Sequence, residues 1–134
     1  MDILVVDDTP DVADIVAQML ALQGHRARIA TTLDEASREI VERRYDACIV
    51  DLGIEDEEEC LPELLRARGV RAVACTARED LWRGNRRTAL YEFFFTKPSS
   101  FDIILAAVEG REYPACRKPI SLAANHADCT WRRR

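Results

Sequence analysis

Short apolar runs that alternate with helical segments constrain the fold of this chain more than any other feature. The runs occupy residues 2–8, 25–30, 45–51, 70–76 and 92–96, and each of them ends in or is followed at once by a polar residue. The run over 25–30 is less apolar than the others, so we expect it nearer an edge of the sheet. Runs of this length, rich in β-branched residues, are typical of buried strands. The segments between them place apolar residues three and four apart, which predicts helices. Strands and helices in alternation predict an α/β fold, with helices on both faces of a parallel sheet.

Capping residues delimit the expected helices. A helix over residues 10–23 follows Thr9 and Pro10, and a second, through residue 44, opens with a capping box formed by Thr32 and Glu35. A third helix is expected to begin at about residue 56, or near residue 60, and to end at residue 68. Residues 78–89 are weakly periodic and are expected to form a short helix. The final helix of the chain would follow Ser99 and end at Gly110. The residues expected to face the core on the first two helices are Val12, Ile15, Val16, Met19, Leu20, Leu33, Ala36, Ile40 and Val41.

Composition excludes several classes of protein. The 134 residues carry a net charge of -5, whereas a general nucleic-acid binder would present a basic face. No apolar run approaches the roughly 18 residues that span a bilayer, and no basic segment typical of a signal peptide begins the chain. We therefore expect a cytoplasmic protein. The five cysteines are odd in number and show no CxxC spacing, which argues against a disulfide framework or a zinc site.

The chain is expected to form one domain over residues 1–111. Residues 112–134 contain prolines and three terminal arginines without any periodic pattern, and they are too few for a second domain. We expect this C-terminal tail to be extended or partly disordered.

Polar side chains close four of the expected strands. They are Asp7, Asp8, Asp51, Thr76 and Lys97. The carboxyl ends of parallel strands meet at one edge of a sheet, where ligands bind. Carboxylates crowded there repel one another, and a hard cation such as Mg²⁺ would relieve that repulsion. With a carboxylate as nucleophile, and a lysine and a hydroxyl to hold phosphoryl oxygens, the set suits phosphoryl transfer.

The same residues carry a resemblance to the response-regulator receiver domains of two-component signalling, over roughly residues 2–110. The motifs are Val5-Val6-Asp7-Asp8, Ile49-Val50-Asp51, Cys75-Thr76-Ala77 and Thr96-Lys97-Pro98, each after a strand and in the family's order. The resemblance implies a doubly wound, flavodoxin-like (βα)5 fold with a five-stranded sheet in the order 2-1-3-4-5. It also implies a stand-alone receiver that catalyses only its own phosphorylation and dephosphorylation.

The resemblance assigns roles to individual residues. Asp51 would accept the phosphoryl group. Asp8, Asp51 and the carbonyl of Gly53 would bind Mg²⁺, with Asp7 acting through water. Thr76 and Lys97 would hold the phosphoryl oxygens. Phe94 matches the family's switch aromatic, although an ordinary core phenylalanine is equally expected in its strand. The donor would be a histidine kinase or a histidine phosphotransfer protein, and the output a protein target.

Two rival functions stay open at the level of sequence. The first is a receiver-like binding module that works without phosphorylation. The intact set of site residues argues against it. Where the family usually has proline and glycine after the acceptor, this chain has Glu55 and Glu59, and the altered loop at Glu55 argues mildly for it. A Mg²⁺-dependent phosphohydrolase usually carries a second acid two residues after its nucleophile. Gly53 occupies that position, so the hydrolase is the weaker rival.

Overall fold

The computed structural model of the protein describes residues 1–51, 61–76, 91, 93–96 and 101–111. Five parallel strands form one sheet in the order β2-β1-β3-β4-β5. They are β1 (Asp2–Val6), β2 (Arg26–Ala30), β3 (Ala47–Asp51), β4 (Arg71–Thr76) and β5 (Phe93–Thr96). The order matches the one that the resemblance implied, and the predicted α/β fold is confirmed.

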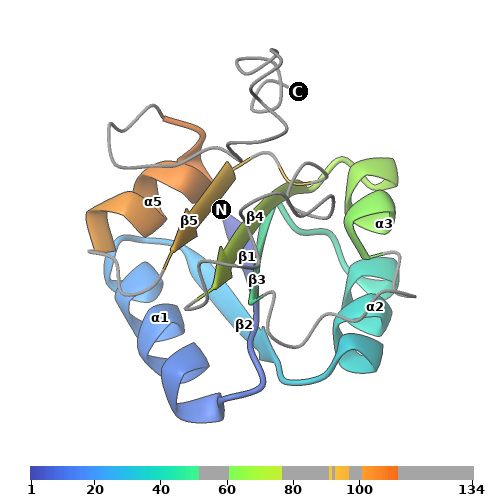
Figure 1. The fold of residues 1–134 in the computed structure, drawn as a ribbon, viewed down its shortest axis with the longest axis horizontal. Coiled ribbons are helices and arrows are strands. Elements are labelled where there is room, and N and C mark those ends of the chain that lie inside the picture. The colour runs from blue at the N-terminus through green and yellow to red at the C-terminus, as the bar shows by residue number, and fades with distance from the viewer. Residues whose placement is uncertain (52–60, 77–90, 92, 97–100, 112–134) are drawn as a thin grey trace.

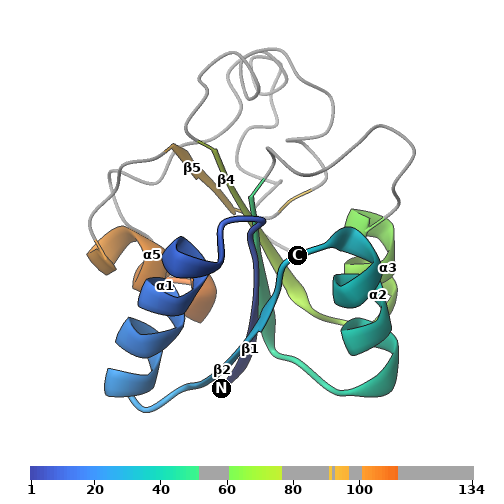
Figure 2. The same ribbon diagram turned by 90° about the horizontal axis from the view of Figure 1, so that it is seen from below.

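Helices cover both faces of the sheet. They are α1 (Pro10–Leu22), α2 (Leu33–Glu42), α3 (Leu61–Ala67) and α5 (Phe101–Glu109). Seen along the sheet, α1 and α5 lie on one side and α2 and α3 on the other (Figures 1 and 2). The central strands β1 and β3 are mostly apolar on both faces because both faces are covered. In β1, Ile3 and Val5 join the α1 and α5 side, whereas Leu4 and Val6 join the α2 and α3 side.

The predicted caps are present with altered hydrogen bonds. The Thr32 hydroxyl accepts the Glu35 N–H at 3.1 Å, but the Glu35 carboxylate reaches one residue further back and accepts the Thr31 N–H at 2.7 Å. Thr9 is the N-cap residue of α1, although its hydroxyl makes no capping hydrogen bond. Helix α2 ends at Glu42, two residues earlier than expected.

The apolar stripe expected to face the core on α1 is wrong in part. Leu20 is buried and Val16 packs against the core, but Val12, Ile15 and Met19 are 37%, 57% and 37% exposed. The buried stripe instead includes Ala13. Helix α1 is apolar on more than one face, so periodicity alone cannot say which face packs on the sheet. On α2, Ala36 and Ile40 are buried as predicted, whereas Val41 is 56% exposed.

Gly110, directly after α5, has a left-handed backbone and lies beside the Arg71 side chain. Gly110 has φ +78°, and a Cβ built on it would lie 2.9 Å from the Arg71 guanidinium carbon. Gly24, after α1, also has a positive φ of +92° but meets nothing within 4 Å. We expect Gly110→Ala and Gly24→Ala each to lower the free energy of unfolding by about 1 kcal/mol, because alanine is strained at a left-handed φ and the flexible end of the Arg71 side chain can move away from an added Cβ. Urea denaturation measures both losses, and wild-type stability of either variant would contradict the prediction.

Two further expectations concern the core and the membrane. Cys48 and Cys75 are buried, as expected of small apolar residues, and burial raises the pKa of the Cys48 thiol. Within the described ranges, no helix has the length and apolar character needed to cross a membrane. The expected helix over 78–89, the run of acids at 55–59 and the tail from 112 lie outside the described residues.

Candidate functional site

Three carboxylates gather at the carboxyl edge of the sheet. Asp7 follows the last residue of β1, Asp8 is next to it, and Asp51 ends β3. One carboxylate oxygen from each lies within 4.8 Å of one from each of the others. The structure therefore brings together three of the residues predicted to form the site.

The register of the sheet explains why they meet. In the parallel pair β1–β3, Val6 lies opposite Val50, so the chain brings Asp7 level with Asp51 one residue later. Successive side chains of a strand point to opposite faces. Asp51 follows the alternation of Ala47 and Ile49, which face α1 and α5. A slip of one residue in either strand would separate the two carboxylates.

The three acids differ in their surroundings. Asp7 is 4% exposed, and its carboxylate accepts the Thr9 N–H at 3.0 Å, where the chain turns into α1. Asp51 is half-buried and Asp8 is exposed. Three negative groups this close repel one another by about 1 kcal/mol per pair even at the dielectric constant of water. Carboxylate oxygens in such a cluster are the ligands that Mg²⁺ and Ca²⁺ prefer.

The remaining predicted site residues are less fully placed. Thr76 ends β4, one residue beyond the Cys75 that lies opposite Asp51, and it pairs with Thr96 at the end of β5. Phe94 pairs with Ala74. The structure gives the backbone position of these two residues. Gly53, Lys97 and Pro98 lie outside the described residues, so their predicted roles stay predictions.

A comparison with models of known protein families identifies the family of this chain. The model of the response regulator receiver domain matches residues 3–109, most of the chain. The chain belongs to this family. Receiver domains are the signalling modules of two-component systems rather than classical enzymes, and all four motifs on which the resemblance was based fall within the matched residues.

Known proteins give further comparisons for this receiver domain. Part of it, 54 residues or 40% of the chain, is 41% identical to the nitrogen assimilation regulatory protein NtrX of Azorhizobium caulinodans, and this match spans 12% of that longer protein. The response regulator TrrA of Thermotoga maritima, solved with Mg²⁺ and BeF, aligns at a TM-score of 0.68 with 24% identity, covering 81% of this chain and 96% of that one.

A second solved structure adds a phosphorylated relative. A response regulator of Burkholderia pseudomallei, solved with a phosphorylated aspartic acid, a calcium ion and citrate, aligns at a TM-score of 0.67 with 23% identity. The alignment covers 80% of this chain and 65% of that one. At these identities the two structures establish the fold of the receiver domain.

Sequence reasoning missed an exposed apolar stripe on α1. Val12, Ile15, Met19 and Leu22 are 37%, 57%, 37% and 84% exposed. They recur every three or four residues and so share one face of the helix, which begins two residues after Asp8. The sequence contains one signal of this stripe. Leu22 is apolar but is not among the residues expected to face the core, which indicates that the helix has a second apolar face.

Proposed function

We propose that this receiver domain accepts a phosphoryl group on Asp51, from a histidine kinase or a histidine phosphotransfer protein, in a Mg²⁺-dependent reaction. The observation that carries the proposal is the cluster of Asp7, Asp8 and Asp51 carboxylates within 4.8 Å at the carboxyl edge of the sheet. Each of the three comes from a family motif. The relatives with a phosphorylated aspartate and with Mg²⁺ and BeF support the proposal by analogy of fold.

The chemistry assigns one task to each residue. A carboxylate oxygen of Asp51 forms the new P–O bond while the P–N bond of the phosphohistidine breaks, and the electron pair of that bond stays on the imidazole nitrogen. Asp8 and the carbonyl of Gly53 would join Asp51 as ligands of Mg²⁺, with Asp7 acting through water, and the ion would neutralise charge on the transferred group when bound. The donor set fits the ion, because all of its members are hard oxygens.

The other predicted residues would act on the phosphorylated state. Thr76 ends β4, which pairs with β3, and Lys97 comes directly after β5, which pairs with β4. These two residues would hold the phosphoryl oxygens by a hydroxyl donor and an ammonium charge. Movement of Thr76 toward the phosphoryl group would change the surface shown to a downstream protein target. Phe94 would follow that movement if it is a switch residue rather than an ordinary core residue. We place this signalling in the cytoplasm.

A small phosphoryl donor tests the proposal directly. Incubation of the protein with acetyl phosphate and Mg²⁺ should add one phosphoryl group, measured by intact-mass spectrometry, and hydroxylamine should remove it because it cleaves acyl phosphates. Incorporation that needs no Mg²⁺ would refute the metal dependence. No incorporation at all would refute the proposal and favour a binding module that works without phosphorylation.

The exposed stripe on α1 gives the donor protein a docking surface. It starts beside the carboxylate cluster and extends about 15 Å along the helix from Val12 to Leu22. Contiguous exposed apolar residues mark interaction sites. A protein that delivers a phosphoryl group to Asp51 must approach this edge of the sheet, so α1 lies within its reach.

We expect Ile15→Asp to slow phosphotransfer from the donor kinase about fivefold, while the rate with acetyl phosphate stays unchanged. Because only the protein donor would contact this face of α1, comparing the rates with the two donors separates an effect on docking from an effect on the chemical step. Val41→Asp is the matched control, because Val41 is 56% exposed against 57% for Ile15 but lies on α2, on the other side of the sheet. Equal slowing by both variants, or slowing with acetyl phosphate, would argue against docking on α1.

A further inference from the structure

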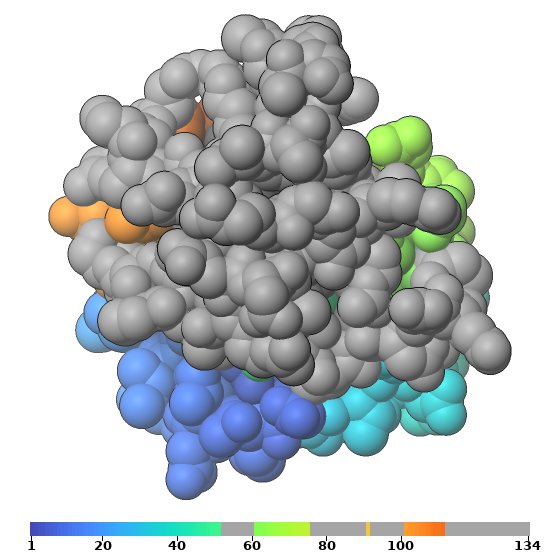
Figure 3. All heavy atoms as spheres, in the orientation of Figure 1, coloured from blue at the N-terminus to red at the C-terminus, as the bar shows by residue number. Residues whose placement is uncertain are grey.

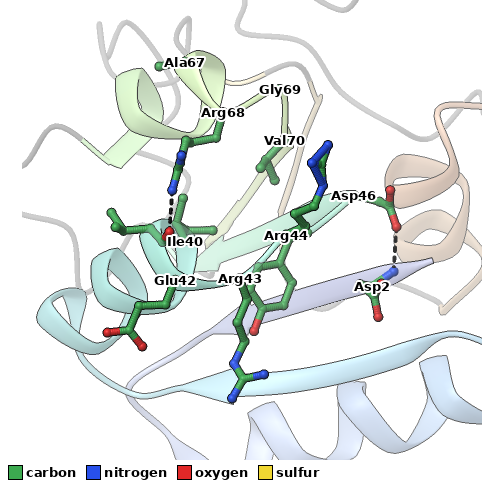
Figure 4. Close-up of a pocket in the computed structure, with 12 residues that line it drawn as sticks. Asp2, Ile40, Glu42, Arg43, Arg44, Asp46, Ala67, Arg68, Gly69 and Val70 are labelled. Atoms are coloured by element: carbon green, nitrogen blue, oxygen red, sulfur yellow. Dashed lines mark hydrogen bonds between the residues drawn. The ribbon is translucent and has the colours of Figure 1, made fainter.

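Two adjoining grooves lie at the amino ends of β1, β2 and β3, at the edge of the sheet opposite the carboxylate cluster. The larger is lined by residues 40–46 and 67–70 together with Asp2 (Figure 4). The smaller is lined by Asp2, Arg26, Arg28, Arg43, Arg44 and Tyr45, so four of its six residues are arginines. The two grooves share four residues and Arg68 lines the larger one, so together we call them the arginine groove.

Three separate parts of the chain supply the arginines. Arg26 and Arg28 are alternate residues of the edge strand β2 and lie opposite Asp2 and Leu4, so they share the sheet face on which Leu4 packs against α2 and α3. Arg43 and Arg44 lie between α2 and β3, and Figure 4 shows their side chains extending in opposite directions. The lining of the two grooves therefore holds five arginines against three acidic residues, Asp2, Glu42 and Asp46, which leaves an excess of positive charge.

Part of this charge is already neutralised. The Arg26 guanidinium donates to both carboxylate oxygens of Asp2, at 2.6 and 3.0 Å, and Arg43 pairs with Glu39 at 3.2 Å. The Asp46 carboxylate accepts the Asp2 N–H at 2.7 Å. By contrast, Arg28 and Arg44 are exposed and make no hydrogen bond or ion pair within the described part of the chain. Two guanidinium groups are thus available for an anionic ligand.

Tyr45 gives the groove a fixed wall. Its side chain is 8% exposed, and its hydroxyl donates to the Glu39 carboxylate at 2.6 Å. Burial and the neighbouring Glu39 raise the pKa of the Tyr45 hydroxyl, which keeps it neutral at physiological pH. The same Glu39 carboxylate holds Arg43, so the aromatic ring and this guanidinium are fixed by one group. A ligand would meet a partly ordered surface, which lowers the entropy lost on binding.

A structural role explains only two of the five arginines. Charged side chains on an edge strand prevent pairing with another sheet, which would account for Arg26 and Arg28 on β2. It does not account for Arg43 and Arg44, which come from another segment and line the same groove. The gathering of five arginines is also unexpected in a chain whose net charge is -5.

We propose that the arginine groove binds an acidic, extended segment of a partner protein. Guanidinium groups match carboxylates in geometry as well as in charge. The arginines are spread from β2 to the end of α3 along grooves that are open to solvent, which suits a polypeptide better than one small anion. The exposed side chain of Val41 adds an apolar contact in the same groove. This site is independent of phosphorylation, because it lies at the opposite edge of the sheet.

Fluorescence anisotropy with a labelled peptide of alternating glutamate and serine tests the proposal. The double variant Arg28→Glu with Arg44→Glu should weaken binding at least about tenfold. The matched control is Arg38→Glu with Arg66→Glu, which changes the net charge equally at two exposed arginines outside the groove and should change binding less than about twofold. Asp51→Ala should bind as the wild type does, so this test and that of phosphoryl transfer fail separately.

Three results would overturn the proposal. Absence of binding by the wild type at low salt would remove the site. Equal weakening in both double variants would show that only net charge matters. Displacement of the peptide by ATP or inorganic phosphate at concentrations below that of the peptide would assign the groove to a small anion. Circular dichroism of each variant establishes that the fold is retained.

Discussion

Replacement of Asp51 by asparagine should abolish phosphoryl incorporation from acetyl phosphate and from a kinase. Asparagine keeps nearly the shape of the side chain but removes the negative oxygen that forms the P–O bond. Because Asp51 ends β3 and is half-buried, the change removes charge from a crowded cluster, and the variant should be folded. Intact-mass spectrometry after incubation with each donor measures the loss.

Glu42→Gln is the control for this prediction. It also removes one carboxylate, but from the end of α2 in the arginine groove, at the opposite edge of the sheet. We expect it to incorporate phosphate at the wild-type rate. Residual incorporation in Asp51→Asn near the wild-type level would mean that another carboxylate accepts the group, and Asp8 would be the first to examine because it is exposed beside Asp51.

The carboxylate cluster could be predicted because each of its members follows from local sequence and one topological rule. A buried strand that ends on an acid is visible in Val5-Val6-Asp7-Asp8 and in Ile49-Val50-Asp51. Parallel strands then place both ends at one edge. The approach of the carboxylate oxygens to within 4.8 Å of one another follows from the pairing of Val6 with Val50, which sequence alone does not specify.

The orientation of α1 could not be predicted by the same reasoning. Its sequence contains two apolar stripes, one through Ala13, Val16 and Leu20 and one through Val12, Ile15 and Leu22. The second has the larger side chains at two of its positions, yet the first is buried, because small Ala13 allows close approach of the helix to the sheet. Packing distance, a tertiary property, decides between the two stripes.

The arginine groove is also invisible in the sequence, for a different reason. Arg28 and Arg44 belong to no motif and are 16 positions apart in the chain. Single arginines on an edge strand or after a helix are ordinary surface residues. They come together only because alternate residues of β2 share one face of the sheet, and because the chain between α2 and β3 returns to the same edge of the sheet.

The carboxylate cluster also predicts opposite effects of one substitution on stability and on metal binding. We expect Asp8→Asn to stabilise the metal-free protein by about 1 kcal/mol, because it relieves repulsion within 4.8 Å of two other carboxylates at an exposed position. The same change should weaken Mg²⁺ binding about a hundredfold, since the ion loses a charged ligand. Urea denaturation without Mg²⁺ and titration of the thermal midpoint with Mg²⁺ measure the two effects.

Asp14→Asn separates this local repulsion from the overall charge of the protein. Asp14 is exposed on α1 outside the cluster, and asparagine can still accept the hydrogen bond that Gln18 donates to it at 2.7 Å. The net charge changes from -5 to -4 in both variants, so a stabilisation that comes from net charge would appear in both. Stabilisation confined to Asp8→Asn, together with loss of Mg²⁺ affinity, would mean that the fold holds the three carboxylates together against their repulsion and that the cation relieves it. Unchanged Mg²⁺ affinity in Asp8→Asn would exclude this carboxylate from the metal site.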